Sequence, residues 1–161
     1  MNYQDWKPTN AHLIFETIDL VSLTNAVINS LRLIIAESNL DINFKHNESE
    51  ILIDADLEMI KTVIQNFVTN AIKHATNQII INVEKSSKGV SLSVSNDGEM
   101  INKTQIEKIW DVFYKTELKK HNRLGSSGIG LSIAKNILML HHFEYGCNSN
   151  KELTTFWFKT K

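Results

Sequence analysis

The chain has 161 residues, of which 42% are hydrophobic and 22% are charged, so it can build one core of ordinary domain size and lacks the composition of a disordered protein. Its 17 basic and 18 acidic residues give a net charge of −1, which argues against the broad basic surface of a nucleic-acid-binding protein. The single cysteine, Cys147, excludes an intramolecular disulfide and a multi-cysteine zinc site, and it favours a reducing compartment.

The sequence shows no sign of a membrane span or of a secretion signal. It contains no run of about 18 apolar residues, and residues 1–10 are polar where a signal peptide would need an apolar segment. We therefore expect one domain over residues 1–161, with residues 1–12 as a linker remnant, in a soluble cytoplasmic segment.

The hydrophobic pattern predicts a mixture of helices and strands. Strands are expected at residues 13–18, 40–44, 78–84, 90–95 and 154–159, with a short apolar run at 51–53. Helices are expected at residues 19–36, 56–75, 104–114 and 129–140, the first of them capped by Asp19. This order predicts an α+β fold, a two-layer α/β sandwich.

The helix expected at residues 56–75 carries a polar rim. At about 100° per residue, Asn66, Asn70 and Lys73 fall within one narrow arc beside an apolar stripe of four residues: Ile60, Ile64, Phe67 and Ala71. Asparagine is a poor residue within a helix because its side chain competes for the backbone. The rim is either an incidental solvated face or a magnesium and phosphate site, since carboxamide oxygens suit Mg²⁺ and a lysine can meet phosphate charge.

A turn-like sequence follows the strand expected at residues 90–95. Asn96, Asp97 and Gly98 form either an ordinary Asn-Asp-Gly turn or a strand end whose side chain enters a pocket for a nucleotide base. Because side chains alternate along a strand, Asn96 and Asp97 are expected to point in opposite directions. Only Asn96 is therefore a candidate for that pocket.

Three of the six glycines, Gly125, Gly128 and Gly130, lie close together. Scarce glycine that clusters in this way indicates a requirement of the backbone. The segment leads into the helix expected at residues 129–140, so it is either a hinge with a helix cap or an anion seat made by free N–H groups at a helix start. Its spacing matches neither a P-loop nor a dinucleotide-binding fingerprint.

The order of these segments resembles the catalytic and ATP-binding domain of sensor histidine kinases, members of the GHKL superfamily. The resemblance rests on the motifs that the family calls the N box, first glycine box, F box and second glycine box: Asn66-x-x-x-Asn70-Ala71-x-Lys73-His74, Asn96-x-Gly98, Ile109-Trp110-x-x-Phe113-Tyr114-Lys115 and Gly125-x-x-Gly128-x-Gly130-Leu131. The details look most like Gram-positive kinases of the vancomycin-resistance sensor type. The resemblance implies a Bergerat fold, a mixed sheet of about five strands with three main helices on one face.

The resemblance also implies ATP and Mg²⁺ as cofactors. Asn70 would ligate Mg²⁺, Asn66 would help to hold the metal or the phosphates, and Lys73 would contact phosphate; these three are the expected catalytic residues. Asn96 would bind the adenine amino group. Residues 115–127 would form a mobile lid. The full set of expected cofactor-binding residues is Asn66, Asn70, Lys73, His74, Asn96, Gly98, Ile101, Tyr114, Lys115, Gly125, Ser127, Gly128, Ile129, Gly130 and Leu131.

Two positions depart from the family pattern: Asn96 stands where Asp is usual, and Met100 stands where the first glycine box has its second glycine. None of the six histidines lies in a phosphoacceptor context. We therefore expect the chain to act on a dimerisation and phosphoacceptor domain of the same kinase, with a response regulator as the next partner. The whole kinase would lie in the cell membrane, while this segment would be monomeric and contact neither membrane nor nucleic acid.

The resemblance thus predicts an ATP-dependent protein histidine kinase domain that transfers the γ-phosphate to a histidine on a separate helix. The alternatives with the same fold are a free-standing anti-sigma-type serine kinase and a hydrolytic ATPase module. Both normally carry Glu at the position of Asn66. A nucleotide-free docking module is a further alternative, which binding of an ATP analogue would exclude.

Overall fold

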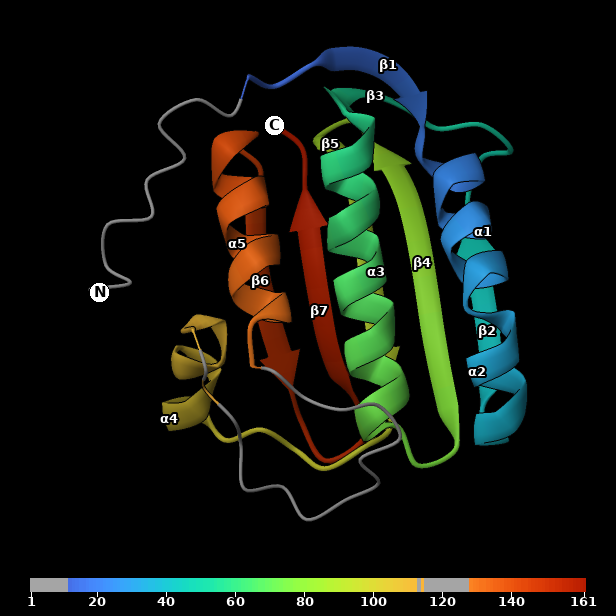
Figure 1. The fold of residues 1–161 in the computed structure, drawn as a ribbon, viewed down its shortest axis with the longest axis vertical. Helices are drawn as coiled ribbons and strands as arrows, with labels where there is room; N and C mark the ends of the chain where they lie inside the picture. Colours follow the sequence, from blue (N-terminus) through green and yellow to red (C-terminus); the bar gives the residue numbers. More distant parts are fainter. Residues whose placement is uncertain (1–11, 113, 115–127) are drawn as a thin grey trace.

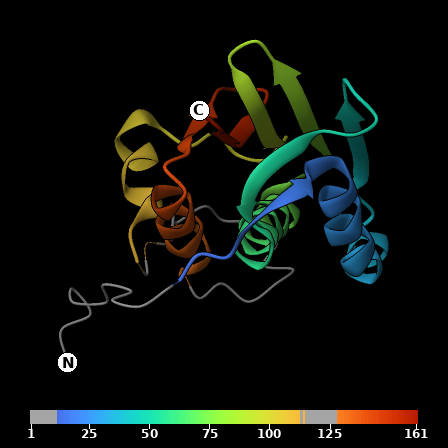
Figure 2. The same cartoon turned by 90° about the horizontal axis from the view of Figure 1, so that it is seen from above.

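The computed structural model describes residues 12–112, 114 and 128–161, which form two layers (Figure 1). One layer is a five-stranded sheet with the order β2-β4-β5-β7-β6, formed by β2 (Asp41–His46), β4 (Gln78–Ser86), β5 (Gly89–Asn96), β7 (Thr154–Lys159) and β6 (Glu144–Ser149). The other layer covers one face of that sheet (Figure 2) and contains α1 (Leu20–Ser30), α3 (Leu57–His74) and α5 (Gly130–Leu140). The remaining elements are α2 (Arg32–Ser38), the short α4 (Lys103–Ile106), and a separate ribbon of β1 (Phe15–Asp19) and β3 (Leu52–Asp56).

The sheet is mixed because β2 runs parallel to β4 while the other neighbours are antiparallel. Apolar side chains alternate along its central strands, so one face is buried against the helices. These buried residues include Ile79, Ile81, Val83, Leu92, Val94, Phe156 and Phe158. The predicted fold class, a two-layer α+β sandwich with three main helices on one face of a mixed sheet, is confirmed.

Helix α3 lies at the centre of the helical layer (Figure 1). It begins where the sequence indicates, because the Asp56 carboxylate accepts a hydrogen bond from the Met59 N–H at 3.1 Å and caps the first turn. The predicted apolar stripe is buried, with Ile60, Ile64 and Phe67 at 0% exposure. The polar rim therefore runs along the border between this buried face and the surface.

The helix expected at residues 19–36 is broken into α1 and α2, which meet at an angle of 60°. Asp19 caps α1 as predicted, by accepting the Val21 N–H at 3.1 Å. The break follows Ser30, whose hydroxyl donates to the Val27 carbonyl at 2.7 Å. Such local side-chain bonds compete with the helix ladder and bend the chain, which the apolar pattern does not reveal.

The helix expected at residues 104–114 is wrong in extent. Among the described residues of this range, α4 is the one α-helix, and a 3₁₀ turn follows at Lys108–Trp110. Ile109 and Trp110 are both buried in this turn. The Trp110 ring meets Tyr145 edge-on at a centroid distance of 5.1 Å and Phe156 at 5.7 Å.

Strand β6 was not predicted from the sequence. Its residues are polar for the most part, and only Cys147 is buried, so neither alternation nor β-propensity indicates a strand. It is placed by its pairing with β7, across which Gly146 lies opposite Trp157. A Cβ at Gly146 would lie 2.7 Å from the indole Cζ2, so this edge strand needs glycine there.

Within the described part of the chain, no single helix is both long and apolar enough to cross a membrane. Helices α1 and α2 satisfy that test only when the bent pair is taken together.

Candidate functional site

The polar rim of α3 lies where the sequence predicts it. Asn66, Asn70, Lys73 and His74 are all half-buried on the second half of the helix. Among the residues that the structure describes, neither the Asn66 nor the Asn70 carboxamide makes a hydrogen bond, whereas buried polar groups are usually satisfied. Two amide groups at the border of the core are thus available to a ligand.

The start of α5 packs against this rim. A Cβ at Gly130 would lie 2.8 Å from Asn66 Oδ1, so the absence of a side chain is what lets the first turn of α5 approach the carboxamide. Gly128 has a φ of 71°, a left-handed conformation that favours glycine. Among the described residues, no side chain caps this helix start, and its first N–H groups point toward the end of the molecule that carries the rim.

The end of β5 packs against the end of α3. A Cβ at Gly98 would lie 2.0 Å from the His74 carbonyl oxygen, so this position cannot carry a side chain without moving the backbone. Asn96 is 2% exposed, and its Oδ1 accepts the Gly98 N–H at 3.0 Å. The first glycine box and the N box are therefore in direct contact, although residues 75–97 separate His74 from Gly98 in the sequence.

Asp97 turns away from Asn96, as strand alternation predicts. Its Oδ1 accepts the N–H groups of Thr76, Asn77 and Gln78 at 2.9, 3.0 and 3.1 Å. Partial burial opposes ionisation, but these hydrogen bonds outweigh it and hold the pKa of the Asp97 carboxyl below its ordinary value. Asp97 therefore fixes the turn between α3 and β4 and is not an alternative for Asn96.

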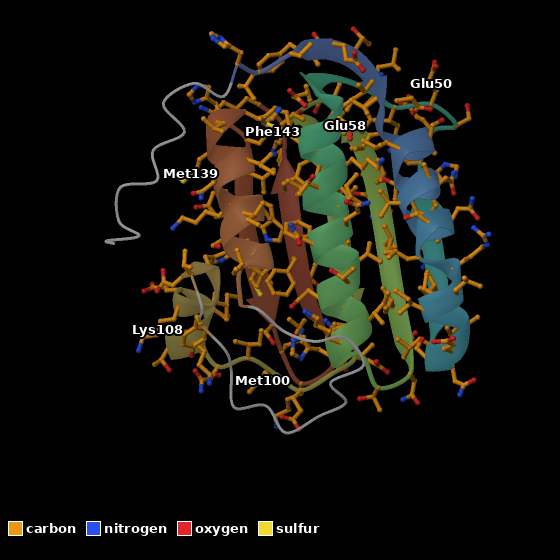
Figure 3. All side chains as sticks on the ribbon, viewed as in Figure 1. Glu50, Glu58, Met100, Lys108, Met139 and Phe143 are labelled. Atoms are coloured by element: carbon orange, nitrogen blue, oxygen red, sulfur yellow. The ribbon has the colours of Figure 1, made fainter. Side chains whose placement is uncertain are left out.

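The segment after Gly98 is anchored by residues that the sequence did not single out. The Ile101 N–H donates to Ser149 Oγ at 2.8 Å, and that hydroxyl also bonds to Thr154 Oγ1 at 2.6 Å. Ile101 itself is 8% exposed. Met100, the departure from the second glycine, is 47% exposed and lies at the same end of the molecule as the C-terminus of α3 (Figure 3). No motif could indicate this anchor, because Ser149 belongs to the unpredicted strand β6.

The remaining expected site residues divide into two groups. Ile129 is half-buried beside Gly128 and Gly130, and Leu131 and Tyr114 are half-buried against the core. Lys115, Gly125 and Ser127 lie outside the described residues, as does the whole segment 115–127 that was expected to form a lid.

The charge state of His74 follows from its surroundings. Burial lowers the pKa of the imidazole below its ordinary value, the positive charge of Lys73 lowers it further, and Glu99 opposes both. His74 is therefore neutral near pH 7, and Lys73 is the cation at this end of α3.

Solved structures place this architecture in a class. The catalytic domain of histidine kinase ThkA superposes with a TM-score of 0.80 at 28% identity, covering 90% of this chain and 93% of that one. A structure of ThkA in complex with the response regulator TrrA matches with a TM-score of 0.78 at 29% identity, covering 92% of this chain and 42% of that one. The fold is that of a histidine-kinase catalytic domain.

The sequence gives the family. Residues 55–161 match the family described as histidine kinase-, DNA gyrase B-, and HSP90-like ATPases, and the chain therefore belongs to it. Sensor histidine kinase YkoH of Bacillus subtilis is 30% identical over 134 residues, which cover 83% of this chain and 29% of YkoH. Sensor protein VanS of Enterococcus faecium is 28% identical over 113 residues, covering 69% of this chain and 29% of VanS.

Within the family, the chain is similar to the ATP-binding catalytic domain of sensor histidine kinases and spans less than a third of the length of the two relatives. These relatives favour the histidine kinase function over the serine kinase and the hydrolytic ATPase. VanS is no more similar than YkoH, so the comparisons do not single out the vancomycin-resistance type.

Proposed function

We propose that the chain binds ATP with Mg²⁺ at the junction of α3, α5 and the end of β5, and that it transfers the γ-phosphate to a histidine on another domain of its kinase. The observation that carries the proposal is the approach of Gly130 to the Asn66 carboxamide. It joins two motifs that are far apart in the sequence into one surface with oxygen donors, N–H donors and a cation, which is the combination that a metal-bound triphosphate needs.

The residues present fit a magnesium ion. Asn70 is the proposed metal ligand, and Asn66 holds the metal or the phosphates, because both carboxamides offer neutral oxygen donors on one helix face. When bound, Mg²⁺ would neutralise charge on the phosphates. Lys73 contributes the protein's own positive charge to that neutralisation, and the N–H groups at the start of α5 contribute partial positive charge.

The base end of the proposed site is formed by Asn96, Gly98 and Ile101, with neutral His74 beside them. Asn96 would contact the base, because its carboxamide is fixed at the end of β5 beside the C-terminus of α3. The roles expected for Tyr114, Lys115, Gly125 and Ser127 in a lid stay predictions from the sequence. With the base held at Asn96 and the phosphates held along the α3 rim, the γ-phosphate would be positioned for transfer.

The nature of Asn66 favours transfer over hydrolysis. A general base near the γ-phosphate would have to deprotonate water, and a carboxamide has no useful basicity. Loss of a general base costs about 10²–10⁴ in rate, so the chain alone is expected to hydrolyse ATP slowly. The triphosphate would then be kept for a histidine nucleophile supplied by the dimerisation domain.

The proposed partners extend beyond this chain. The phosphoacceptor domain of the same kinase would supply the histidine, and a response regulator would follow, as the ThkA–TrrA complex supports. The low coverage of the relatives fits a kinase with further domains, and we place that kinase in the cell membrane with the catalytic domain in the cytoplasm.

Calorimetry of ATP-analogue binding tests the proposal. Magnesium-dependent binding is expected for the wild-type chain, and Asn70→Ala should weaken it by at least about tenfold, the lower end of what loss of even an indirect metal partner costs. Alanine is the better helix former, so the loss would not reflect unfolding. Gln65→Ala, which removes another amide from the same helix, should bind as the wild type does. Unchanged affinity in Asn70→Ala would reject the assigned metal site.

A further inference from the structure

The carboxamide of Asn96 has one orientation. Its Oδ1 accepts the Gly98 N–H at 3.0 Å, and only the oxygen of a carboxamide can accept from an N–H group. The opposite orientation would place Nδ2 against that N–H, so that two donors would face each other. Oδ1 therefore lies toward Gly98, and Nδ2 occupies the other position of the amide plane.

The surroundings prevent this arrangement from relaxing. Asn96 is 2% exposed, and its residue position pairs with Ile79 on one side and with Thr154 on the other. Gly98 has no room for a side chain between these groups, because a Cβ there would lie 2.0 Å from the His74 carbonyl oxygen and 2.8 Å from Asn96 Oδ1. The base end of the site thus has a rigid edge with one partly used acceptor and one donor.

The adjacent carboxylate, that of Asp97, does not restore an acceptor-only edge. The Asp97 carboxylate already accepts hydrogen bonds from the N–H groups of residues 76–78. A carboxylate at position 96 could only accept hydrogen bonds, whereas the carboxamide can both accept and donate.

Purine bases differ at the 6-position in whether they donate or accept a hydrogen bond. Adenine carries an amino group, which donates, while hypoxanthine and guanine carry a keto oxygen, which accepts. An acceptor-only edge would suit adenine and repel a keto oxygen. The Asn96 edge can accept an amino or ring N–H at the second lone pair of Oδ1 and can donate from Nδ2 to a keto oxygen or a ring nitrogen.

We propose that the nucleotide site accepts 6-oxopurine triphosphates as well as ATP, and that Asn96 determines this breadth. The inference rests on the proposed function, because it takes the base to lie against Asn96. It goes beyond that function by naming the substrate class and the residue that sets it.

Affinities of ATP and inosine triphosphate, measured with Mg²⁺, test the inference. The wild-type chain is expected to bind the two within about tenfold of each other, and Asn96→Asp should widen the ratio by about tenfold or more, because one good base contact discriminates by roughly that factor. Asn148→Asp makes the same chemical change on the exposed part of β6 and should leave the ratio unchanged. A wild-type chain that rejects inosine triphosphate as strongly as Asn96→Asp does would overturn the inference.

A second comparison needs no variant. Purine riboside triphosphate lacks a 6-substituent, so it should bind the wild-type chain more weakly than inosine triphosphate if Nδ2 donates to the keto oxygen. Tighter binding of the unsubstituted base would overturn the inference. Binding of ATP without inosine triphosphate would overturn the inference and leave the proposed function standing, whereas failure of all three nucleotides would reject the proposed function itself.

Discussion

Helices α3 and α5 lie side by side (Figure 1), and the contacts at the two ends of this pair, its two junctions, are built differently. At one end, where α3 begins and α5 stops, the Asp56 N–H donates to His141 Nε2 at 3.1 Å, and His141 Nδ1 bonds to the Ile137 carbonyl at 2.8 Å. The Asp56 carboxylate accepts the N–H groups of Ile14 and Met59. Here the polar groups satisfy one another.

At the other junction, where α5 begins, the polar groups do not satisfy one another in this way. Gly130 approaches the Asn66 carboxamide, and the rim beside it carries amide groups without hydrogen bonds among the described residues. Buried polar groups cost free energy unless they are paired. The first junction is therefore structural, while the second retains the polar groups that a ligand would satisfy.

The charge state of Asp56 also fits a structural role for the first junction. At the structural junction, the hydrogen bond from the Ile14 N–H is the main cause that lowers the pKa of the Asp56 carboxyl, against the opposing effect of burial. A cleft lined by Leu52, Asp54, His141 and Phe143 also lies at that end, and Phe143 marks it in Figure 3. This cleft lies at the end of α3 opposite to the proposed binding residues.

The largest effect on stability is expected from Gly98→Ala. The added Cβ would lie 2.0 Å from the His74 carbonyl, and overpacking of this kind costs about 1–3 kcal/mol or more. Chemical denaturation should show this loss together with weaker nucleotide binding, since Gly98 belongs to both the fold and the site. A variant with unchanged stability would show that the ends of α3 and β5 are not pressed together.

His141→Leu should destabilise the chain by about 1–3 kcal/mol, because it leaves the Asp56 N–H without its acceptor. His141→Gln keeps an acceptor and should recover part of the loss in a denaturation experiment. Nucleotide affinity should stay the same in both variants. A large loss of affinity at unchanged stability would contradict the separation of the two junctions.

Gly130→Ala should show the opposite pattern from the His141 variants: weaker nucleotide binding with little change in stability. The Cβ would displace the Asn66 carboxamide, so ATP-analogue affinity is expected to fall about tenfold, equivalent to about 1.4 kcal/mol. Alanine is also the better helix former, so calorimetric unfolding should show little change. Ser132 cannot serve as the control because it is buried, but Lys135→Ala, on the same helix, should leave both properties unaltered.

The smallest effect concerns pH. Burial lowers the pKa of His74 in the folded chain below its ordinary 6.5, so the unfolded chain takes up a proton first as the pH falls. Stability should therefore decline as the pH drops below about 6.5 toward the folded pKa, by less than about 1 kcal/mol from this residue. His74→Asn should show a shallower decline in denaturation between pH 7 and 5. A steeper decline would mean that burial does not oppose protonation of His74.

Local chemistry made much of this predictable. The cap at Asp19, the stripe around Phe67 and the opposite directions of Asn96 and Asp97 follow from short-range rules of capping and periodicity. The motif order gave the fold class and the family correctly, because each motif holds residue types with a defined role.

Long-range packing was the part that could not be predicted. Strand β6 exists because β7 pairs with it, and the 3₁₀ turn exists because Trp110 is drawn into a cluster with Tyr145 and Phe156. Glycine scarcity pointed to a backbone requirement but not to its cause. The causes, a carbonyl beside Gly98 and a carboxamide beside Gly130, come from residues far along the chain.

Phosphotransfer in trans tests the central claim most directly. The chain would be mixed with labelled ATP, Mg²⁺ and the separately produced dimerisation hairpin of its kinase, with an Asn70→Ala reaction in parallel. We expect label on the hairpin that is acid-labile and alkali-stable, as phosphohistidine is, with no label on the chain itself, slow release of free phosphate, and no transfer by Asn70→Ala. Alkali-labile phosphoserine, or rapid hydrolysis by the chain alone, would contradict the proposed function.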